Sequence, residues 1–353
     1  MGKPLRIATF NVENLLHDGA RFERDPGKPG YTKTMFAGKT QWIRGILGEG
    51  NVGLVGFQEL FSRKALDEVL AGSPLAAHVI APDLDDNIIA GTPEPLARGP
   101  FCGLATNLEV LTAPADARIF EFPEAVKAGL VVAADHAGTD PVALPITRFQ
   151  RPVIRVEVKL PGDTIATVFV THLKSKLGQF LPDEDHNDPL AIALASTRSL
   201  VIRAAEGVAL RSLVLDAIAD NDRPVILLGD LNDEISAVST QTIAGPTPWR
   251  FAKKEQKLPV FDRLLYSAHD IQGQQTLRDV DYTHIFDGRY QLLDHVFVSQ
   301  ELFGRGPKPV GMLRNTRIFN DHLIDSGLAI NVPSGLSARS DHGIVVAEIE
   351  LFD

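Results

Sequence analysis

The chain contains a single cysteine, Cys102, among its 353 residues, so no disulfide can form within it. No apolar run approaches the ~18 residues that a membrane-spanning helix needs. The start of the chain, MGKPLRIATFNVENLL, has no long apolar stretch and no small-residue cleavage site, and it is typical of a first strand rather than a signal peptide. These absences predict a cytoplasmic protein with no membrane partner, or a secreted protein if a leader segment was removed from a precursor.

An excess of basic residues is also missing. The 35 Lys and Arg residues are outnumbered by 45 Asp and Glu residues, which gives a formal net charge of -10. Non-specific nucleic-acid-binding proteins usually carry a broad basic surface, so that binding mode is disfavoured. An enzyme that acts on nucleic acid stays compatible with this charge, because metal ions and a local basic patch can bind phosphate on an acidic protein.

The apolar content, in contrast, is high enough for a large core. Hydrophobic residues make up 44% of the chain, which suits one large domain or two smaller ones. Short runs rich in Val, Ile and Leu recur from end to end and predict strands. Segments with apolar residues at three- and four-residue spacing predict helices at about 40–49, 63–72 and 190–219. The segment 240–259 contains three prolines and is expected to be a loop. Many strands without regular βαβ alternation predict an α+β fold, in which two packed sheets carry helices outside.

Polar residues stand at the ends of several predicted strands. In the run ILLGDLND, residues 226–233, three apolar residues and a glycine precede a cluster with Asp230, Asn232 and Asp233. An ordinary strand followed by an Asx turn would also explain this stretch. The same pattern recurs in FNVEN, FQEL, VTHLKS, LLDHVF and RSDHG. Because a buried carboxylate is costly unless it is paired or binds a metal, the recurrence favours one shared functional site.

The polar groups at these strand ends are carboxylates, amides and histidines. Carboxylate-rich oxygen sites suit Mg²⁺ or Mn²⁺. A histidine that is oriented by a carboxylate suits phosphoryl chemistry. The combination therefore indicates metal-assisted attack of water on a phosphorus centre.

The ordered series FNVEN, QE, THLKS, GDLND, LDHVF and SDH resembles the endonuclease/exonuclease/phosphatase superfamily, which includes deoxyribonucleases, sphingomyelinases and inositol phosphatases. The resemblance extends from Asn11 to His342, and GDLN together with SDH is its most specific part. NVENLL and YTHIFDGRYQLLDHVFVS are most similar to the bacterial extracellular-nuclease-like branch. The resemblance implies one domain over residues 1–353 with a DNase I-like fold, a four-layered α/β sandwich of two packed mixed β-sheets flanked by helices.

The resemblance also implies a role for each motif residue. Glu59 and Asp341 match the metal-binding carboxylates, and Asn11 matches the asparagine beside the metal, as a ligand, a neighbour of the ligands or a substrate contact. The expected ion is Mg²⁺, with Mn²⁺ as an alternative. Asp230 matches the residue that orients or deprotonates the attacking water. Asn232 is expected to hold that carboxylate and a phosphate oxygen.

Further motif residues are expected to face the substrate phosphate. His342 matches the histidine that faces the scissile phosphate, and Asp294 is its partner, which would raise the pKa of the imidazole. His172 matches a second phosphate-contacting histidine. Arg151 resembles an arginine near the phosphate pocket, although Arg148 is a competitor three positions away.

Some neighbouring residues have less specific signals. His295 follows Asp294 on a predicted strand, where neighbours face opposite sides, so it is expected to pack away from the site. The acidic loop at 178–189 could bind a second metal, but a solvated loop or lid is favoured because runs of charge usually are solvated. Lys174 and Lys176 could reach the phosphate or face solvent.

The leading function is a metal-dependent phosphodiester hydrolase, a nuclease that acts on DNA or RNA. The alternative is a phosphoesterase for a small molecule or lipid headgroup, of the inositol phosphate or sphingomyelinase type. A non-catalytic binding protein on the same fold is disfavoured because no core motif is missing. A nuclease should place aromatic and basic groups beside the site. The candidates for these groups are Trp249, Arg250, Lys253, Lys254, Tyr282 and Phe286.

Overall fold

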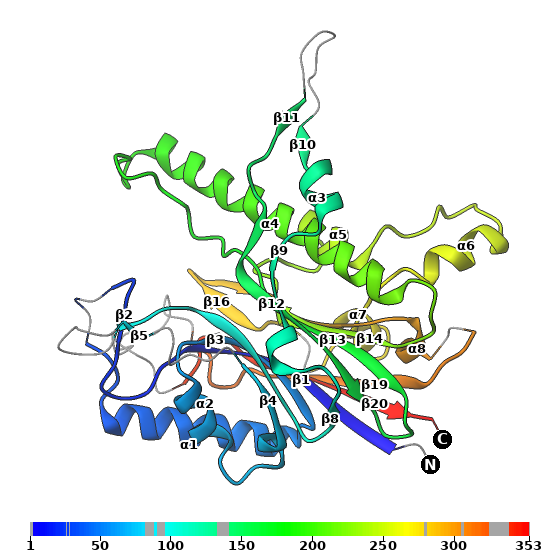
Figure 1. The fold of residues 1–353 in the computed structure, drawn as a ribbon, viewed down its shortest axis with the longest axis horizontal. Coiled ribbons are helices and arrows are strands. Elements are labelled where there is room, and N and C mark those ends of the chain that lie inside the picture. The colour runs from blue at the N-terminus through cyan, green and yellow to red at the C-terminus, as the bar shows by residue number, and fades with distance from the viewer. Residues whose placement is uncertain are drawn as a thin grey trace.

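Two mixed β-sheets pack face to face and carry helices on their outer sides (Figure 1). The computed structural model describes residues 3–25, 27, 29–81, 88–89, 96–132, 141–278, 281–304, 307–324 and 339–352. The layers are helices, sheet, sheet and helices, which confirms the predicted α+β sandwich. The long first and last strands lie side by side, so the two ends of the chain emerge close together.

The first sheet is centred on β1 (Lys3–Leu15). Its strand order is β19 (Gly311–Phe319), β20 (Ile344–Leu351), β1, β3 (Leu54–Leu60), β7 (Phe101–Thr106) and β4 (His78–Ile80). β1 pairs with β3 in parallel and with β20 in antiparallel orientation. The parallel pairing brings the carboxyl ends of β1 and β3, and the polar residues that they carry, to the same edge.

The second sheet has a similar parallel pair at its centre. Its strand order is β15 (Tyr266–Ser267), β18 (Asp294–Val298), β14 (Val225–Asp230), β13 (Ile165–His172), β12 (Arg148–Lys159) and β8 (Glu109–Val110), and β9 (Arg118–Glu121) also pairs with β12. β13 and β14 are parallel, so both end at one edge of the sheet. β18 runs antiparallel to β14 and begins where β14 ends.

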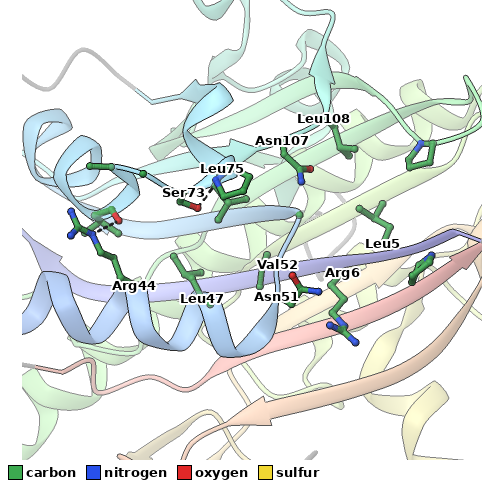
Figure 2. A pocket seen from close by; sticks show the side chains of 18 residues that line it. Leu5, Arg6, Arg44, Leu47, Asn51, Val52, Ser73, Leu75, Asn107 and Leu108 are labelled. Atoms are coloured by element: carbon green, nitrogen blue, oxygen red, sulfur yellow. Dashed lines mark hydrogen bonds between the residues drawn. The ribbon is translucent and has the colours of Figure 1, made fainter.

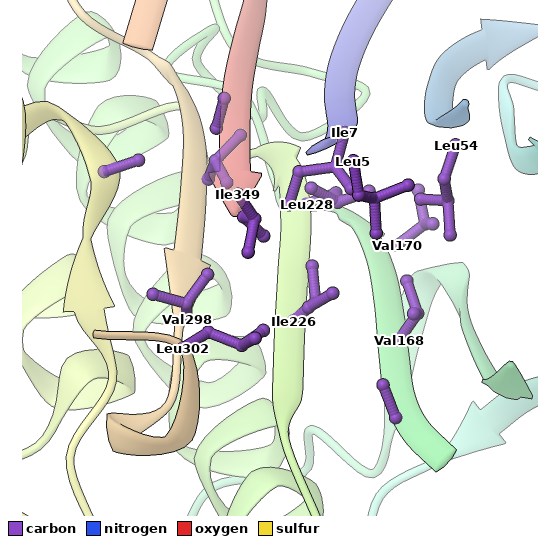
Figure 3. Close-up of a cluster of buried hydrophobic side chains, with 14 of the residues drawn as sticks. Leu5, Ile7, Leu54, Val168, Val170, Ile226, Leu228, Val298, Leu302 and Ile349 are labelled. Carbon is purple, nitrogen blue, oxygen red and sulfur yellow. The ribbon is translucent and has the colours of Figure 1, made fainter. Parts of the chain in front are cut away.

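The main hydrophobic core fills the space between the two sheets. Leu5 and Ile7 from β1 meet Val170 of β13 and Leu228 of β14, with Leu54 beside them (Figure 3). These side chains are at most 5% exposed, so each contributes close to its full transfer free energy, about 1.5–3 kcal/mol. Their packing fixes the two sheets relative to one another, and with them the polar strand ends of both sheets.

Helices cover the outer faces, and their ends carry the expected capping residues. α1 (Lys33–Gly50) and α2 (Arg63–Leu70) pack on the first sheet, and α4 (Pro189–Ile218) packs on the second. Thr32, Ser62 and Asp188 cap these three helices by accepting a hydrogen bond from a backbone N–H of the first turn. All three predicted helices are thereby confirmed.

The expected loop at 240–259 is wrong in part. It contains the end of α5 (Val238–Ala244) and most of α6 (Lys254–Phe261), which includes Pro259. Gly245 ends α5 with a φ of 94°, and the backbone N–H of Lys253 donates to the Gln256 side chain at the start of α6. The expected loop is therefore confined to the segment between α5 and α6. The helix α6 accommodates its proline because a short helix tolerates one missing N–H when its other residues favour the helix.

Smaller elements complete the described chain. They are β2 (Arg21–Phe22), β5 (Ile88–Ile89), β6 (Leu96–Ala97), β10 (Val131–Val132), β11 (Val142–Ala143), β16 (His284–Phe286), β17 (Arg289–Gln291), α3 (Glu124–Gly129), α7 (Ala268–Gly273), α8 (Gln300–Phe303) and the 3-10 turns Pro74–Ala77 and Pro114–Asp116. α3 and the β10–β11 pair project from the body of the molecule in Figure 1. Among the described residues, no helix has the length and apolar content to cross a membrane.

Candidate active site

The polar ends of the central strands meet where the two sheets face each other. His172 of β13 is in register with Asp230 of β14, and Asp230 is in register with Asp294 of β18. Residues in register on neighbouring strands point to the same face of a sheet, so these three side chains form a row. Asn11 lies on β1 just before its register with β3 shifts, and it links the two sheets because its Nδ2 donates to Asp230 Oδ2 at 3.0 Å.

Asp230 lies at the centre of this arrangement. Besides the Asn11 bond, its Oδ1 accepts the backbone N–H of Asn232 at 2.8 Å. Its Oδ2 lies 3.5 Å from His172 Nε2 and 3.9 Å from His342 Nε2. Burial and the nearby Asp294 raise the pKa of Asp230 to about 7, against the lowering effect of His342 and of the donated hydrogen bonds. A carboxyl group with this pKa can accept a proton near neutral pH.

Asn232 holds Asp230 differently from the expected side-chain contact. Its backbone N–H makes the bond to the carboxylate, while its side-chain Nδ2 donates to the Leu173 carbonyl at 3.0 Å. The residue adopts a φ of 54°, a left-handed conformation that asparagine tolerates. This turn directs the backbone N–H of Asn232 back toward Asp230, the last residue of β14.

His342 and Asp294 form a buried pair. His342 Nδ1 donates to Asp294 Oδ2 at 2.7 Å, and the two side chains are 8% and 0% exposed. Burial acts to lower the pKa of His342, but attraction to Asp294 and the hydrogen bond between them outweigh it and raise that pKa well above its usual value. The imidazolium form is therefore stabilised, with its Nε2–H directed toward Asp230.

His172 is held in the opposite protonation state. Burial lowers the pKa of His172 well below its usual value, and the positive charges of Arg151 and His342 lower it further. Arg151 itself donates from Nη1 to the Leu173 carbonyl at 3.0 Å, whereas its competitor Arg148 is exposed at the start of β12. The site thus contains one histidine favoured as a cation, one favoured as neutral, and a fixed guanidinium.

Three carboxylates gather on the other side of Asn11. Burial raises the pKa of Glu13 to about 7, with further raising effects from Asp341 and Glu59, while Lys39 acts to lower it. Glu59 Oε2 accepts the Asn14 N–H at 3.0 Å. Glu13, Asn14 and Glu59 all have positive φ, at 48°, 56° and 63°. Residues other than glycine adopt this left-handed conformation only where surrounding contacts stabilise it. Such residues are frequent at functional sites.

This carboxylate group fits a hard divalent cation. Glu13 Oε2 is buried and accepts no hydrogen bond from a described residue. Carboxylates that repel one another, one of them with an oxygen that accepts no hydrogen bond, suit the binding of Mg²⁺ or Mn²⁺, because the ion relieves their repulsion. The residues present therefore fit the expected metal. Two compact groups of possible ligands occur in the described chain, namely His284 with Asp341 and His342, and Asp230 with Asp294 and His342. Glu59 belongs to neither group, so the sharing of one ion by Glu59 and Asp341 stays a prediction.

The sequence model of the Endonuclease/Exonuclease/phosphatase family matches residues 8–342. The chain belongs to this family. Its members hydrolyse phosphoester bonds. The buried carboxyl group of Asp230 and the raised pKa of His342 are compatible with that chemistry. The finer likeness to the extracellular-nuclease-like branch stays a prediction, and no curated protein matches the chain in sequence.

Solved structures support the fold of this family. An endonuclease/exonuclease/phosphatase family protein from Bacteroides thetaiotaomicron is 13% identical with a TM-score of 0.51, and the alignment covers 99% of this chain and 98% of that one. The human Nocturnin catalytic domain with bound sulfate is 14% identical, with a TM-score of 0.51 and coverage of 99% and 95%. Truncated Caenorhabditis elegans TDP2 is 13% identical, with a TM-score of 0.50 and coverage of 98% and 97%. At these identities the likeness concerns the fold alone.

Three residues beside these side chains escaped the sequence analysis. Glu13 lies within the quoted motif FNVEN but was assigned no role, and Lys39 lies on α1 with no local signal of function. His284 lies within the quoted run YTHIFDGRYQLLDHVFVS, yet nothing in that run indicates that it lies beside His342. In the structure His284 pairs with His342 through an antiparallel bridge, and their rings lie 4.6 Å apart. Burial and the nearby His342 lower the pKa of His284 to about 4.

A buried glutamate on α4, Glu206, stabilises the backbone beside the site. Glu206 is 1% exposed and accepts two backbone N–H groups, from Gln150 at 2.8 Å and from Lys174 at 2.7 Å. Gln150 directly precedes Arg151, and Lys174 follows His172 by two positions. One carboxylate therefore fixes the backbone next to Arg151 and close to His172.

The residues with less specific sequence signals make hydrogen bonds or ion pairs with other residues. His295 Nε2 donates to the Asp233 carbonyl at 2.8 Å, in line with the expected packing away from the site. In the acidic loop, Glu184 pairs with Arg198 and Asp188 caps α4. These bonds favour a structured loop over a second metal site. Lys176 Nζ lies 3.8 Å from Asp233 Oδ1.

A pocket with a different lining lies elsewhere in the structure. A depression of about 780 Å³ surrounds the amino-terminal part of β1, where Leu5, Arg6, Leu47, Asn51 and Leu108 line it (Figure 2). None of the expected site residues lines it. It has mixed polar and apolar walls without a cluster of titratable groups, so we place the chemistry at the strand ends.

Proposed function

We propose that this protein is a metal-dependent phosphodiester hydrolase that acts on nucleic acid by attack of water on phosphorus. The observation that carries the proposal is the position of Asp230. Its carboxylate is held by Asn11 and Asn232 and faces the imidazolium of His342 at 3.9 Å. A base and a cationic donor that face each other across a narrow gap suit in-line displacement at a phosphate.

In the proposed reaction, Asp230 accepts a proton from the attacking water as its oxygen bonds to phosphorus. The bond between phosphorus and the leaving oxygen breaks, and that oxygen takes up a proton from solvent. The two hydrogen bonds from Asn11 and Asn232 keep the carboxylate oriented and favour its charged form.

His342 has the complementary role. Its Nε2–H is placed to stabilise negative charge that builds up on the phosphoryl oxygens, and Asp294 keeps the ring charged and oriented. His172, favoured as neutral, and the fixed Arg151 are proposed to contact the same phosphate. Preorganised donors of this kind need little reorganisation during the reaction, which is why they contribute strongly to the rate.

Glu59 and Asp341, with Glu13 or Asn11 beside them, are the residues proposed to hold the metal. A bound Mg²⁺ or Mn²⁺ would neutralise phosphate charge and make phosphorus more electrophilic. The catalytic unit is proposed to be one domain over the whole chain, because the site draws residues from both sheets and from Asn11 to His342.

The test is a comparison of substrates under defined metal conditions. The protein is incubated with bis-p-nitrophenyl phosphate, p-nitrophenyl phosphate, plasmid DNA and oligonucleotides, with Mg²⁺, Mn²⁺ or EDTA. We expect metal-dependent cleavage of the diester and of nucleic acid, and at least a 10³-fold loss in Asp230→Asn. The exposed Asp216→Asn on α4 is the matched control. Hydrolysis of the monoester alone would favour the small-molecule phosphatase instead.

A further inference from the structure

The hairpin formed by β16 and β17 lies directly beside the catalytic histidine. His284 pairs with His342 through the antiparallel bridge, and the Gly343 N–H donates to the Thr283 carbonyl at 2.7 Å. Thr283 Oγ1 accepts the N–H groups of Leu293 and Asp294. The base of the hairpin is therefore bonded to both members of the His342–Asp294 pair.

The tip of the hairpin is a tight two-residue turn. Asp287 and Gly288 both adopt positive φ, at 47° and 72°. This combination is typical of the type I′ turn that matches the twist of the flanking strands. The turn sets Phe286 opposite Arg289 in register, so these two side chains share one face of the hairpin.

The rings of three side chains form a row that extends from the site along this face. The His342 and His284 centroids are 4.6 Å apart, and the His284 and Phe286 centroids are 6.3 Å apart at an interplanar angle of 15°. Exposure increases along the row, since His342 is 6% exposed and Phe286 is 53% exposed. Tyr290 pairs with Ile285 and so belongs to the other face, where it contacts Tyr282.

We propose that Phe286 and Arg289 form a subsite for the nucleotide next to the scissile phosphate, with the base stacked on Phe286 and a phosphate held by Arg289. This proposal rests on the proposed function and names the substrate class at that same site. Base stacking on an exposed ring beside a cation is the usual way in which single strands are bound without sequence preference.

The chemistry of the hairpin distinguishes a nucleotide from an apolar partner. Phe286 is followed by Asp287 and pairs with Arg289, and the other exposed ring of the hairpin, Tyr290, belongs to the opposite face, whereas membrane insertion requires a broad apolar face. Arg289 is exposed and makes no ion pair with a residue that the structure describes. One ring and one unpaired cation beside a phosphate site match the base and phosphate of one nucleotide.

The experiment compares two substrates that differ only in a base. One is a thymidine dinucleotide, and the other has a tetrahydrofuran unit in place of one thymidine, tested on each side of the phosphate. Phe286→Ala should lower kcat/KM for the dinucleotide about ten-fold, mainly through KM, and the loss on one abasic analogue should be at least five-fold smaller. Phe286→Trp should restore the preference for the base.

A matched control comes from a remote exposed ring. Phe251 is 70% exposed and contacts Trp249, and it precedes α6, which is far from β16 in Figure 1. Phe251→Ala should leave the ratio between the two substrates unchanged. Equal losses of Phe286→Ala on both substrates would overturn the subsite, because the ring would then only shield His284.

A binding measurement separates this proposal from the proposed function. Fluorescence anisotropy with labelled oligothymidylate and an abasic oligomer of equal length is measured in an Asp230→Asn background. Phe286→Ala should weaken binding of the oligothymidylate about ten-fold more than binding of the abasic oligomer. If the wild-type protein hydrolyses none of the substrates while the Asp230→Asn protein shows a preference for bases that depends on Phe286, the hydrolase is refuted and the subsite is retained. The absence of such a preference in both assays would refute the subsite alone.

Discussion

His342 Nδ1 and Asp294 Oδ2 lie 2.7 Å apart, although 48 positions separate the two residues in the chain. The pair is buried, and Asp294 raises the pKa of His342 well above its usual value despite that burial. A hydrogen bond to a carboxylate also fixes which ring nitrogen faces the substrate. This relationship explains how a buried histidine can stay charged at the pH where the neighbouring base is deprotonated.

The first prediction concerns this pair. Because His342 is proposed to act as a cation, activity should fall as pH rises through its raised pKa, and Asp294→Asn should move that fall to lower pH. We expect a loss in kcat/KM on the order of 10²-fold or more at the wild-type optimum. Asp294→Asn with His342→Ala should be little worse than His342→Ala alone. Multiplicative losses with an unshifted alkaline limb in pH profiles would contradict the pairing.

The second prediction concerns the hydrogen bond between Asn11 and Asp230. The pKa of Asp230 is about 7, so the base form, and with it activity, should be lost as pH falls below that value. Asn11→Leu removes a donor that stabilises the carboxylate, so the acid limb of kcat/KM should move to higher pH. Thr9→Val on the same strand is the control, because Thr9 bonds to Gln58 instead. An acid limb that stays in place in Asn11→Leu would show that this bond does not control the base.

The third prediction concerns the proposed metal ligand Glu59. Glu59→Gln keeps the shape of the side chain and an oxygen for the Asn14 N–H, but it removes a charge. The affinity for Mn²⁺, measured by titration calorimetry, should fall about ten-fold or more, with a change in Tm of at most a few degrees. Glu68→Gln, on the exposed side of α2, should leave Mn²⁺ binding unchanged. Equal affinities in wild type and Glu59→Gln would exclude Glu59 as a ligand.

The sequence indicated which residues converge better than it indicated their contacts. Asn11, His172, Asp230, Asp294 and His342 carried a visible signal, because each is a polar residue next to an apolar run in the sequence. Their convergence follows from two parallel strand pairs, which place carboxyl ends at one edge. The register that puts His172, Asp230 and Asp294 in one row could not be read from strand patterns, since it depends on long-range pairing.

Other parts of the site depend on geometry that leaves no pattern in the sequence. Asn232 was expected to hold Asp230 with its side chain, but its positive φ assigns that bond to the backbone N–H. His284 reaches the site only because its hairpin pairs with the residue after Asp341. Lys39 is one of several basic residues on α1 in the sequence, and only the packing of the helix distinguishes it.

The last prediction concerns this buried lysine. Lys39 is 0% exposed, its Nζ lies 3.8 Å from Glu13 Oε2, and it donates to the Arg339 carbonyl at 3.2 Å. Burial lowers the pKa of Lys39, while Glu13, Asp341 and Glu59 act to raise it. Without a divalent ion, Lys39 is the cation that balances these carboxylates. Removal of one partner of a buried ion pair is strongly destabilising, because the other charge is left uncompensated.

Lys39→Met should therefore lower Tm by several degrees in EDTA, and excess Mn²⁺ should recover much of the loss, because a divalent ion supplies the missing positive charge. The rise in Tm between EDTA and Mn²⁺, followed by circular dichroism, should be larger in Lys39→Met than in wild type. Lys33→Met is the matched control, since Lys33 is exposed at the start of the same helix. Lys39→Arg keeps the charge and should show the wild-type rise if it folds. The same rise in Lys39→Met and wild type would mean that Lys39 and the metal do not balance the same carboxylates.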